Sequence, residues 1–259
     1  SATKVGATFT LPYLAHGTLE PLCCTVRITF SSTTPIFCEV WAPTQAASLV
    51  VTTASTLTGL TAANIKVYTT FLGGGLGRKI EQDYISQAIQ IALAVKRPVK
   101  LTWMREEDFG HDQYRPMALV SAQASLDASN QINAWSYRTV TQSISAQRGR
   151  LAAGAVDNSA VEGAKALPYN RGLYLTEWVP LNVGIPIGYW RSVGSSINTF
   201  VSESIIDMLA QSAGLDPFTF RYSIINNDRV RAVLAAVDQL SAWRTTLPAG
   251  RAWGVALAE

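Results

Sequence analysis

The order of hydrophobic and polar positions predicts strands and helices that alternate along the chain. Residues 65–69 and 99–103 alternate between apolar and polar side chains and are rich in β-favouring residues, which is typical of half-buried strands. Between them, residues 82–95 carry apolar side chains at helical spacing, and Pro98 prevents the helix from continuing. The sequence therefore predicts a strand, a helix and a second strand in that order.

The second half of the chain predicts a hairpin followed by helices. Residues 118–127 and 131–142 are two strand-like runs separated by a short polar turn. A helix is predicted from Thr199, with Gly214 as its C-terminal stop, and Asp216–Pro217 has the form of a cap and first residue of the next helix. The predicted fold class is α+β, with mixed sheets and packed helices.

Composition agrees with a folded domain and argues against several kinds of partner. The chain has 259 residues, of which 48% are hydrophobic and 15% charged, a core-forming composition. Its 21 basic and 18 acidic residues give a net charge of +3 without runs of either sign, so no nucleic-acid partner is expected. No apolar stretch approaches the roughly 20 residues that cross a bilayer.

The cysteines predict no metal site or disulfide, and two further segments bear on the organisation of the chain. Cys23, Cys24 and Cys38 are an odd number without Cys-x-x-Cys spacing, so they predict buried free thiols and no disulfide framework, zinc site or iron-sulfur site. Residues 145–165 are rich in alanine, glycine and serine and are expected to form loops. The final run, 254–259, resembles the start of a strand, and we interpret it as a boundary inside a longer polypeptide.

A glycine-rich loop, Gly73–Lys79, follows one predicted strand and precedes the predicted helix. Its glycines permit positive φ and let the backbone approach a flat or polyanionic ligand. The loop fails the dinucleotide pattern, which needs glycine at Arg78, and it fails the P-loop pattern as well. A ligand loop and a tight structural turn both remain open on this pattern alone.

The two histidines do not form a metal or hydrolase site. His111 lies in the acidic segment 105–112, which lacks a second histidine at metal-ligand spacing and is expected to be a solvated charged loop. His16 stands in an apolar stretch and is expected to be a hydrogen-bonded structural residue. The serines at 192, 195 and 196 lack the nucleophile-elbow pattern of serine hydrolases.

Arg191 lies between aromatic residues and a glycine, directly before a predicted helix. Its planar fork of donors suits an anion or an oxo group. The alternative is a surface ion pair with the arginine stem packed on Trp190.

Taken together, several segments resemble the first cofactor-binding region of molybdenum hydroxylases, the xanthine dehydrogenase and aldehyde oxidase family. They occur in the family's order and are His16–Pro21, Cys38–Gln45, Gly73–Lys79, Lys96–Lys100, Arg105–Asp108 and Trp190–Gly194. The resemblance covers nearly the whole chain and is closest to the bacterial isoquinoline 1-oxidoreductase and membrane-associated aldehyde dehydrogenase branch. It implies that residues 1–259 are the first molybdopterin-binding domain of a longer large subunit.

The resemblance also implies which residues contact the cofactor. The matching positions are Gln45, Gly74, Gly75, Leu76, Gly77 and Arg191. In the family the glutamine lies beside an apical oxo group, the glycine turn runs along the pterin, and the arginine lies near the metal. Leu76 replaces the usual phenylalanine of that turn, and Ser195 stands where this branch more often has histidine, so finer detail of the site does not transfer.

The implied reaction is hydroxylation of an aldehyde or an N-heteroaromatic compound, with water as the oxygen source. The implied cofactor is molybdenum bound to molybdopterin, in its cytosine dinucleotide form. The implied partners are the remainder of the large subunit, a small subunit with [2Fe-2S] clusters, and a cytochrome c subunit. The family's catalytic glutamate comes from a segment beyond Glu259, so this chain is expected to supply neither the base nor a metal ligand. The chain carries no compartment signal, and the resemblance suggests a periplasmic or membrane-associated location.

Two alternatives to a working domain of this family remain. One is a catalytically inactive scaffold homologue, in which Leu76 and Ser195 mark lost activity. The other is an unrelated small-ligand-binding α+β module, because a glycine-rich loop has many uses. Molybdenum content separates the first assignment from these two.

Overall fold

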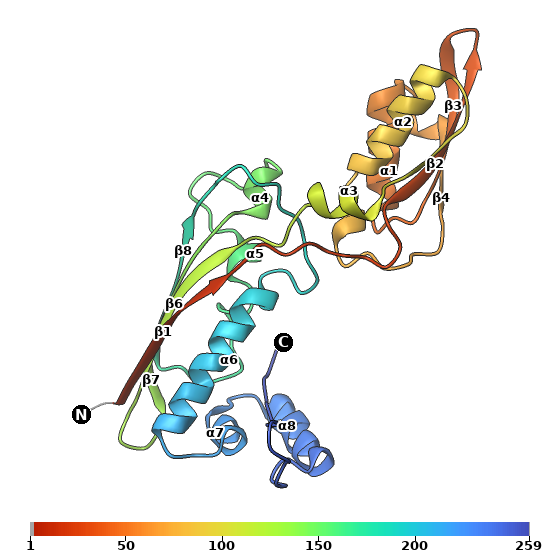
Figure 1. Ribbon diagram of the computed structural model, residues 1–259. Coiled ribbons are helices and arrows are strands. Elements are labelled where there is room, and N and C mark those ends of the chain that lie inside the picture. The colour runs from red at the N-terminus through yellow and green to blue at the C-terminus, as the bar shows by residue number, and fades with distance from the viewer. Residues whose placement is uncertain (1–2, 259) are drawn as a thin grey trace. The chain divides into compact units, whose positions relative to one another are not determined.

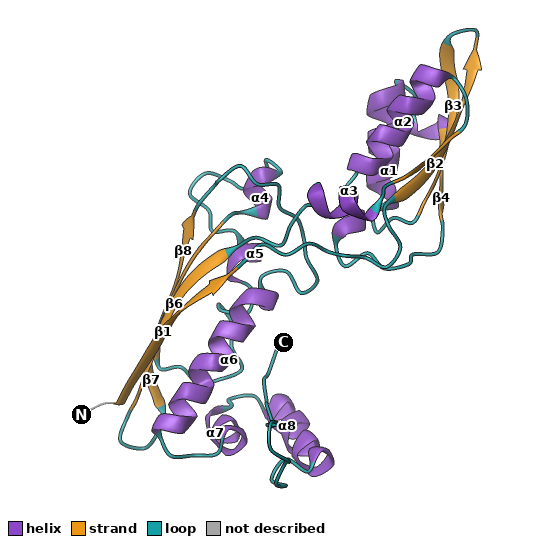
Figure 2. Cartoon of the chain, viewed as in Figure 1, coloured by secondary structure: helices purple, strands orange, loops and turns teal. Residues whose placement is uncertain are grey.

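The computed structural model describes residues 3–258, which divide into two compact units. The glycine-loop unit combines residues 13–115 with residues 185–191, and the hairpin unit contains the remaining described residues. Each unit holds one four-stranded sheet with helices beside it (Figures 1 and 2). The predicted α+β class with mixed sheets and packed helices is confirmed.

The glycine-loop unit is built around a sheet with strand order β4-β3-β2-β5. Its elements are β2 (Cys23–Ser31), β3 (Thr34–Ala42), α1 (Ala47–Thr58), η1 (Ala62–Asn64), β4 (Ile65–Thr69), η2 (Arg78–Ile80), α2 (Asp83–Val95), β5 (Val99–Thr102) and α3 (Arg105–Gly110). β3 and β4 are parallel and are joined through α1, whereas β2 pairs antiparallel with both β3 and β5. The predicted strand, helix and strand are β4, α2 and β5, and the two strands form opposite edges of the sheet.

Both long helices of this unit lie on the same side of the sheet (Figure 1). β2 alternates between buried and more exposed positions, as a strand with one covered face does. The predicted apolar stripe of α2 faces the core, where Ile85, Ala88, Ile89 and Ala92 are fully buried. Cys24 and Cys38 are buried and Cys23 is half-buried, and all three are free, which confirms the free-thiol prediction except for the exposure of Cys23.

The hairpin unit has a second sheet, with strand order β1-β6-β7-β8. Its elements are β1 (Thr3–Leu11), β6 (Ala118–Leu126), β7 (Ile132–Thr141), α4 (Ile144–Gln147), α5 (Asn158–Val161), β8 (Leu173–Pro180), α6 (Ser195–Ser212), α7 (Pro217–Ile224) and α8 (Asp228–Ser241). β6 and β7 form the predicted antiparallel hairpin, and α6 packs across β1 and β6. Buried Val201, Ile205 and Leu209 of α6 meet the sheet there.

Several helix boundaries in this unit confirm or correct the sequence predictions. Gly214 has φ +67° just beyond α6, and Asp216 caps α7 by accepting from the Thr219 N–H, both as predicted. The predicted start of α6 at Thr199 is wrong, because the helix begins at Ser195. Asn198 explains the extension, since its amide donates to the carbonyl oxygens of residues 160 and 162 and anchors the first turn.

Two further expectations need correction. The segment 145–165 is mostly loop, but it also contains the end of α4 and the whole of α5. The run 254–258 forms no strand; instead Val255 and Leu257 pack on the core of the hairpin unit, and the Leu257 N–H donates to Glu203. An apolar pair two residues apart suits either arrangement, so the pattern alone could not separate them.

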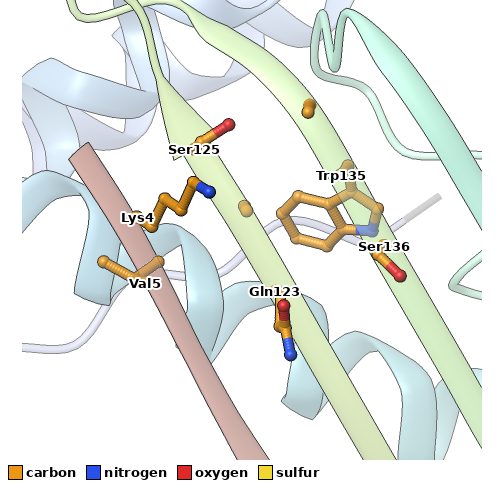
Figure 3. Close-up of a pocket in the computed structure, with 8 residues that line it drawn as sticks. Lys4, Val5, Gln123, Ser125, Trp135 and Ser136 are labelled. Carbon is orange, nitrogen blue, oxygen red and sulfur yellow. The ribbon is translucent and has the colours of Figure 1, made fainter. Parts of the chain in front are cut away.

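The hairpin unit also carries an open depression on its sheet, shown in Figure 3. Lys4 of β1, Gln123 of β6 and Ser136 of β7 are among the residues that line it. It lies outside the glycine-loop unit, which holds the candidate site. Of the helices in the described chain, none has both the length and the apolar character that a transmembrane span requires.

Candidate functional site

The glycine-rich loop between β4 and η2 adopts a backbone that ordinary residues disfavour. Gly74, Leu76 and Gly77 all have left-handed φ, at +96°, +53° and +103°. Left-handed backbone is open to glycine but costs other residues about 1–2 kcal/mol, so Leu76 holds a strained position. Leu76, where the resemblance implies phenylalanine, is therefore the non-glycine residue of the loop that adopts left-handed backbone.

Gln45 is fixed against this loop from two sides. Its backbone N–H donates to the Lys79 carbonyl at 3.0 Å, and its side-chain Oε1 accepts from the Gly77 N–H at 3.1 Å. An N–H can only donate, so this contact also sets which end of the amide faces the loop. Gln45 is exposed, and its Nε2 has no hydrogen-bond partner within residues 3–258, so two N–H donors remain available to a ligand.

Gly75 is required by the position of Gln45. A Cβ on Gly75 would lie 2.3 Å from Gln45 Oε1 and 2.6 Å from its Cδ, well inside contact distance. Any larger residue must displace the Gln45 amide or the loop. The structure thus gives Gly75 a local role, whether or not a ligand lies against its backbone.

Gly77 marks a crossing between the loop and a segment more than a hundred residues later in the chain. A Cβ on Gly77 would lie 1.4 Å from the Tyr189 carbonyl oxygen, so only glycine fits. The segment around Tyr189 is itself fixed by an N–H of Gly188 that donates to Tyr114 O, and by the Trp190 indole, which donates to Ala15 O. The crossing brings the chain that carries Arg191 to the glycine loop.

Arg191 is exposed and forms no ion pair within the described part of the chain. The alternative interpretation, an ion-paired Arg191 packed on Trp190, is not what the structure shows. The guanidinium over the Trp190 ring belongs to Arg115, at 5.7 Å from the ring centroid. Arg191 is therefore a cation available to an anionic or oxo ligand beside the loop.

A buried charged network supports the crossing from behind. Arg78 is fully buried and pairs with Asp83 through both terminal nitrogens, at 3.0 and 2.6 Å, while its Nε lies 2.8 Å from Asp112. Asp112 also accepts from His16, whose Nε2 lies 3.0 Å from the Tyr189 carbonyl oxygen. The network thus connects Arg78, the residue after Gly77, through Asp112 and His16 to the Tyr189 carbonyl on the other side of the crossing.

The prediction of a solvated charged loop at 105–112 is wrong about the loop and about two of its carboxylates, although Glu106, Glu107 and His111 are exposed as predicted. Most of the segment forms α3, and Asp108 and Asp112 are each only 1% exposed. The charge pattern showed the carboxylates but not Arg78, the buried cation that holds Asp112. His16 is the hydrogen-bonded structural residue that the sequence predicted, since both its ring nitrogens have partners.

Burial and neighbouring charges shift the pKa values of Asp112, Asp108 and Arg78. Burial alone would raise the pKa of Asp112, but the hydrogen bonds from His16 and the charge of Arg78 outweigh burial and hold that pKa below its usual value. Burial, together with the neighbouring charge of Asp112, raises the pKa of Asp108. For Arg78, burial lowers the pKa, but Asp83 and Asp112 outweigh it and raise the pKa.

The depressed pKa of Asp112 predicts loss of stability in acid. A carboxylate whose folded pKa lies below its unfolded value stabilises the fold above the unfolded value, about 3.9, and loses that contribution as pH falls through the folded pKa. Urea unfolding between about pH 6 and pH 3 should show this decline in the free energy of unfolding. Asp112→Asn should show a smaller decline, and an unchanged slope would contradict the ion-paired state of Asp112.

Lys79, the lysine of the loop, forms an ion pair with Glu20 of the same unit. Lys79 is fully buried with Nζ 2.5 Å from Glu20 Oε2, and the same carboxylate accepts from the Gly73 N–H at 3.0 Å. Burial would raise the pKa of Glu20, but the hydrogen bond from Lys79 outweighs it and lowers the pKa. Lys79 therefore cannot serve as a phosphate-binding lysine, and the loop offers a ligand backbone N–H groups and the side chains of Gln45 and Arg191.

The remaining candidate residues lie elsewhere. Ser195 begins α6 in the hairpin unit and takes no part in the crossing. Within the described residues, no cluster of three or more His, Cys, Asp or Glu side chains is placed to bind a metal ion. Sequence reasoning named Asp112 only as part of the acidic segment and did not predict that His16 links it to the Tyr189 carbonyl. The available signal was an isolated histidine in an apolar stretch.

Comparison with known proteins identifies the family. The sequence model of the molybdopterin cofactor-binding domain matches residues 1–225. The chain belongs to the molybdenum hydroxylase family. As a molybdopterin cofactor-binding domain, it resembles one subunit of the nicotinate dehydrogenase of Pseudomonas putida, at 24% identity over 94% of this chain and 21% of the relative. It also resembles the beta subunit of isoquinoline 1-oxidoreductase from Brevundimonas diminuta, at 25% identity over 85% of this chain and 29% of the relative.

A third relative and a solved structure agree with this assignment. The molybdenum-binding subunit PaoC of the Escherichia coli aldehyde oxidoreductase is 28% identical over 89% of this chain and 30% of the relative. Quinoline 2-oxidoreductase from Pseudomonas putida 86 has the same fold, with a TM-score of 0.76 over 93% of this chain and 33% of that one, at 18% identity. The molybdopterin cofactor-binding domain thus spans between about a fifth and a third of the length of these relatives.

Proposed function

We propose that this chain is the first molybdopterin-binding domain of a larger molybdenum hydroxylase subunit that oxidises an aldehyde or an N-heteroaromatic compound. Water supplies the oxygen, and electrons leave to [2Fe-2S] clusters on a partner subunit. The proposal is supported by the chain's family membership and by relatives that are named for aldehydes, isoquinoline and nicotinate. It is also supported by length, because the chain spans less than a third of each of these relatives.

One observation carries the proposal to particular residues. The Gly77 N–H holds the oxygen end of the Gln45 amide and leaves its two N–H donors without a partner, beside a loop of left-handed glycines. This donor set fits a group with oxo and phosphate oxygens, because it offers N–H groups and a guanidinium, while the carboxylate of Glu20, which contacts the loop at Gly73, is ion-paired with Lys79. Gln45, Gly74, Gly75, Leu76, Gly77 and Arg191 are the residues we propose to hold the molybdopterin group.

When bound, such a group supplies the hydroxylation chemistry. The chain's own residues would orient and stabilise the group: the Gln45 amide would donate to one of its oxygens, the loop backbone would offer N–H groups, and Arg191 would add positive charge. The Gln45 amide is held by the Gly77 N–H before any ligand arrives, and a fixed donor stabilises developing negative charge at little reorganisation cost. We propose that the base that starts the reaction comes from the remainder of the large polypeptide.

The proposal is tested by molybdenum content and turnover. Purified alone, the chain should contain little molybdenum and should oxidise neither benzaldehyde nor isoquinoline with an artificial electron acceptor. Combined with the remainder of its subunit and the iron-sulfur partner, it should gain both properties. An assembled complex without molybdenum would identify an inactive scaffold homologue or an unrelated binding module, and turnover by the chain alone would show that it contains the base.

Arg191→Lys should separate function from stability. Lysine keeps the charge but loses the planar donor fork, so kcat/KM of the molybdenum-loaded assembly should fall at least about tenfold, or about 1.4 kcal/mol. The free energy of unfolding should change by less than about 0.5 kcal/mol, because the side chain is exposed. Arg229→Lys, at an exposed position on α8, is the control and should change neither value. Wild-type kcat/KM in Arg191→Lys would remove Arg191 from the site.

A further inference from the structure

His16 is bound at both ring nitrogens inside the glycine-loop unit. Its side chain is 1% exposed, with Nδ1 3.0 Å from Oδ1 and 3.1 Å from Oδ2 of Asp112. Its Nε2 lies 3.0 Å from the carbonyl oxygen of Tyr189. That carbonyl is the atom against which Gly77 packs, so the imidazole sits at the crossing itself.

The partner on one side requires a proton on Nε2. A backbone carbonyl oxygen can only accept a hydrogen bond, so the 3.0 Å contact with Tyr189 O is favourable only if Nε2 carries hydrogen. A neutral histidine has one N–H, and in this tautomer Nδ1 would be an acceptor.

The partner on the other side requires a proton on Nδ1 as well. Asp112 receives the backbone N–H groups of His16 and Gln113, at 2.5 and 2.7 Å, and the Arg78 Nε lies 2.8 Å from it. All three of these neighbours are donors, so a protonated Asp112 would bring its own hydrogen against them. Asp112 is therefore a carboxylate, which only accepts, and its contact with Nδ1 is favourable only if Nδ1 also carries hydrogen.

We propose that His16 is a buried imidazolium cation that holds the Gly77–Tyr189 crossing closed, and thus acts as a positioning residue for Gln45 and Arg191. The surrounding charges are consistent with a second cation. The network contains the carboxylates of Asp83 and Asp112 against a single guanidinium, that of Arg78, and a charged His16 balances them. The neighbouring Asp108 has its own cation in Arg105, at 2.6 Å.

The charge has a structural consequence for the site. A neutral His16 must give up one of its two ring hydrogen bonds, so either the tie to Asp112 or the tie to the Tyr189 carbonyl weakens. Loss of the second tie removes one of the hydrogen bonds that hold the backbone two residues before Arg191, and leaves those made by the Gly188 N–H and the Trp190 indole. The relevance of this movement to a cofactor rests on the proposed function, whereas the protonation state does not.

The protonation state can be measured by ¹⁵N NMR of the histidine rings in the chain as it stands. The sequence contains only two histidines, so assignment needs one variant. At about pH 8, where an ordinary exposed imidazole is mostly neutral, His16 should show two protonated ring nitrogens. His111, with a side chain 69% exposed, is the internal reference. A single protonated nitrogen on His16 at this pH would overturn the proposal.

Two variants separate the network from a general effect of nearby acids. Asp112→Asn keeps the shape of the side chain but removes the negative charge, so His16 should become the neutral tautomer with hydrogen on Nε2 only. Glu107→Gln removes the carboxylate 3.3 Å from His111 Nδ1 and should leave the His16 spectrum unchanged. An imidazolium at residue 16 that survives Asp112→Asn would also overturn the proposal.

Molybdenum content of the assembled protein then gives a separate result. If His16 positions the site, Asp112→Asn should lower molybdenum content, while Glu107→Gln should not. A charged His16 in an assembly that never contains molybdenum would contradict the proposed function and leave the imidazolium assignment intact. Full molybdenum retention in Asp112→Asn, with His16 neutral, would show that the charge on His16 does not position Gln45 and Arg191, and would overturn that part of the proposal.

Discussion

Gly77→Ala is expected to destabilise the glycine-loop unit by about 3 kcal/mol or more, and to prevent molybdenum retention. Two costs add at this position. Left-handed backbone costs an alanine about 1–2 kcal/mol, and forced overpacking costs about 1–3 kcal/mol. Here the new Cβ would lie 1.4 Å from a backbone carbonyl oxygen, which cannot move aside as a flexible side chain could. The crossing must therefore open.

Gly59→Ala is the matched control for this experiment. Gly59 also has positive φ, +74°, and lies in the same unit at the end of α1, but a Cβ there has nothing within 4 Å. It should show the conformational cost alone, about 1–2 kcal/mol. Urea unfolding of both variants measures the difference. Equal losses would mean that the Gly77–Tyr189 contact is absent in solution.

Arg78→Met is expected to cost about 3–5 kcal/mol, because it removes the cation from a buried network and leaves its carboxylates behind. Methionine keeps an unbranched side chain but removes the guanidinium, which also lies over the Trp103 ring at 5.5 Å from the ring centroid. The loss therefore reports the guanidinium, through both its ion pairs and its contact with the ring. Arg78→Lys keeps the positive charge, so it should retain part of the stability. It should not retain all of it, because an ammonium cannot reproduce the bidentate pair with Asp83 together with the contact to Asp112.

A surface pair provides the comparison for Arg78→Met. Arg138, whose side chain is 59% exposed, pairs at 2.9 Å with Glu177, whose side chain is 36% exposed, on the sheet of the hairpin unit. Exposed pairs contribute about 0–1 kcal/mol, so Arg138→Met should cost about 1 kcal/mol or less. A cost for Arg78→Met no greater than that of Arg138→Met would contradict the buried network.

Local periodicity explains which parts of the fold the sequence could predict. β4, β5, α2 and the β6–β7 hairpin follow from residue spacing within one element, and the caps at Gly214 and Asp216 follow from local backbone chemistry. The start of α6 escaped prediction because its first turn is held by Asn198 to residues far back in the chain. No local pattern encodes such a contact.

In the candidate site, too, local motifs could be predicted and contacts between distant residues could not. Gln45 and the glycine loop could be proposed from motifs, and the structure brings them into contact through the Gly77 N–H. The partnership of Gly77 with Tyr189, and of Asp112 with Arg78 and His16, could not be proposed, because each joins residues that are distant in sequence. In a sequence, a carboxylate that is buried cannot be distinguished from a solvated one until its ion-pair partner is known.

The discontinuous make-up of both units affects the order in which the chain can fold during synthesis. β1 is synthesised before its partner β6, which follows roughly 110 residues later, a wait of about 5–20 s at about 5–20 residues per second. The glycine-loop unit is also completed late, because residues 185–191, which complete it, are made after β8, the last strand of the hairpin unit's sheet. The apolar side of β1, with Val5, Ala7 and Phe9, is thus a nascent surface on which chaperones can act.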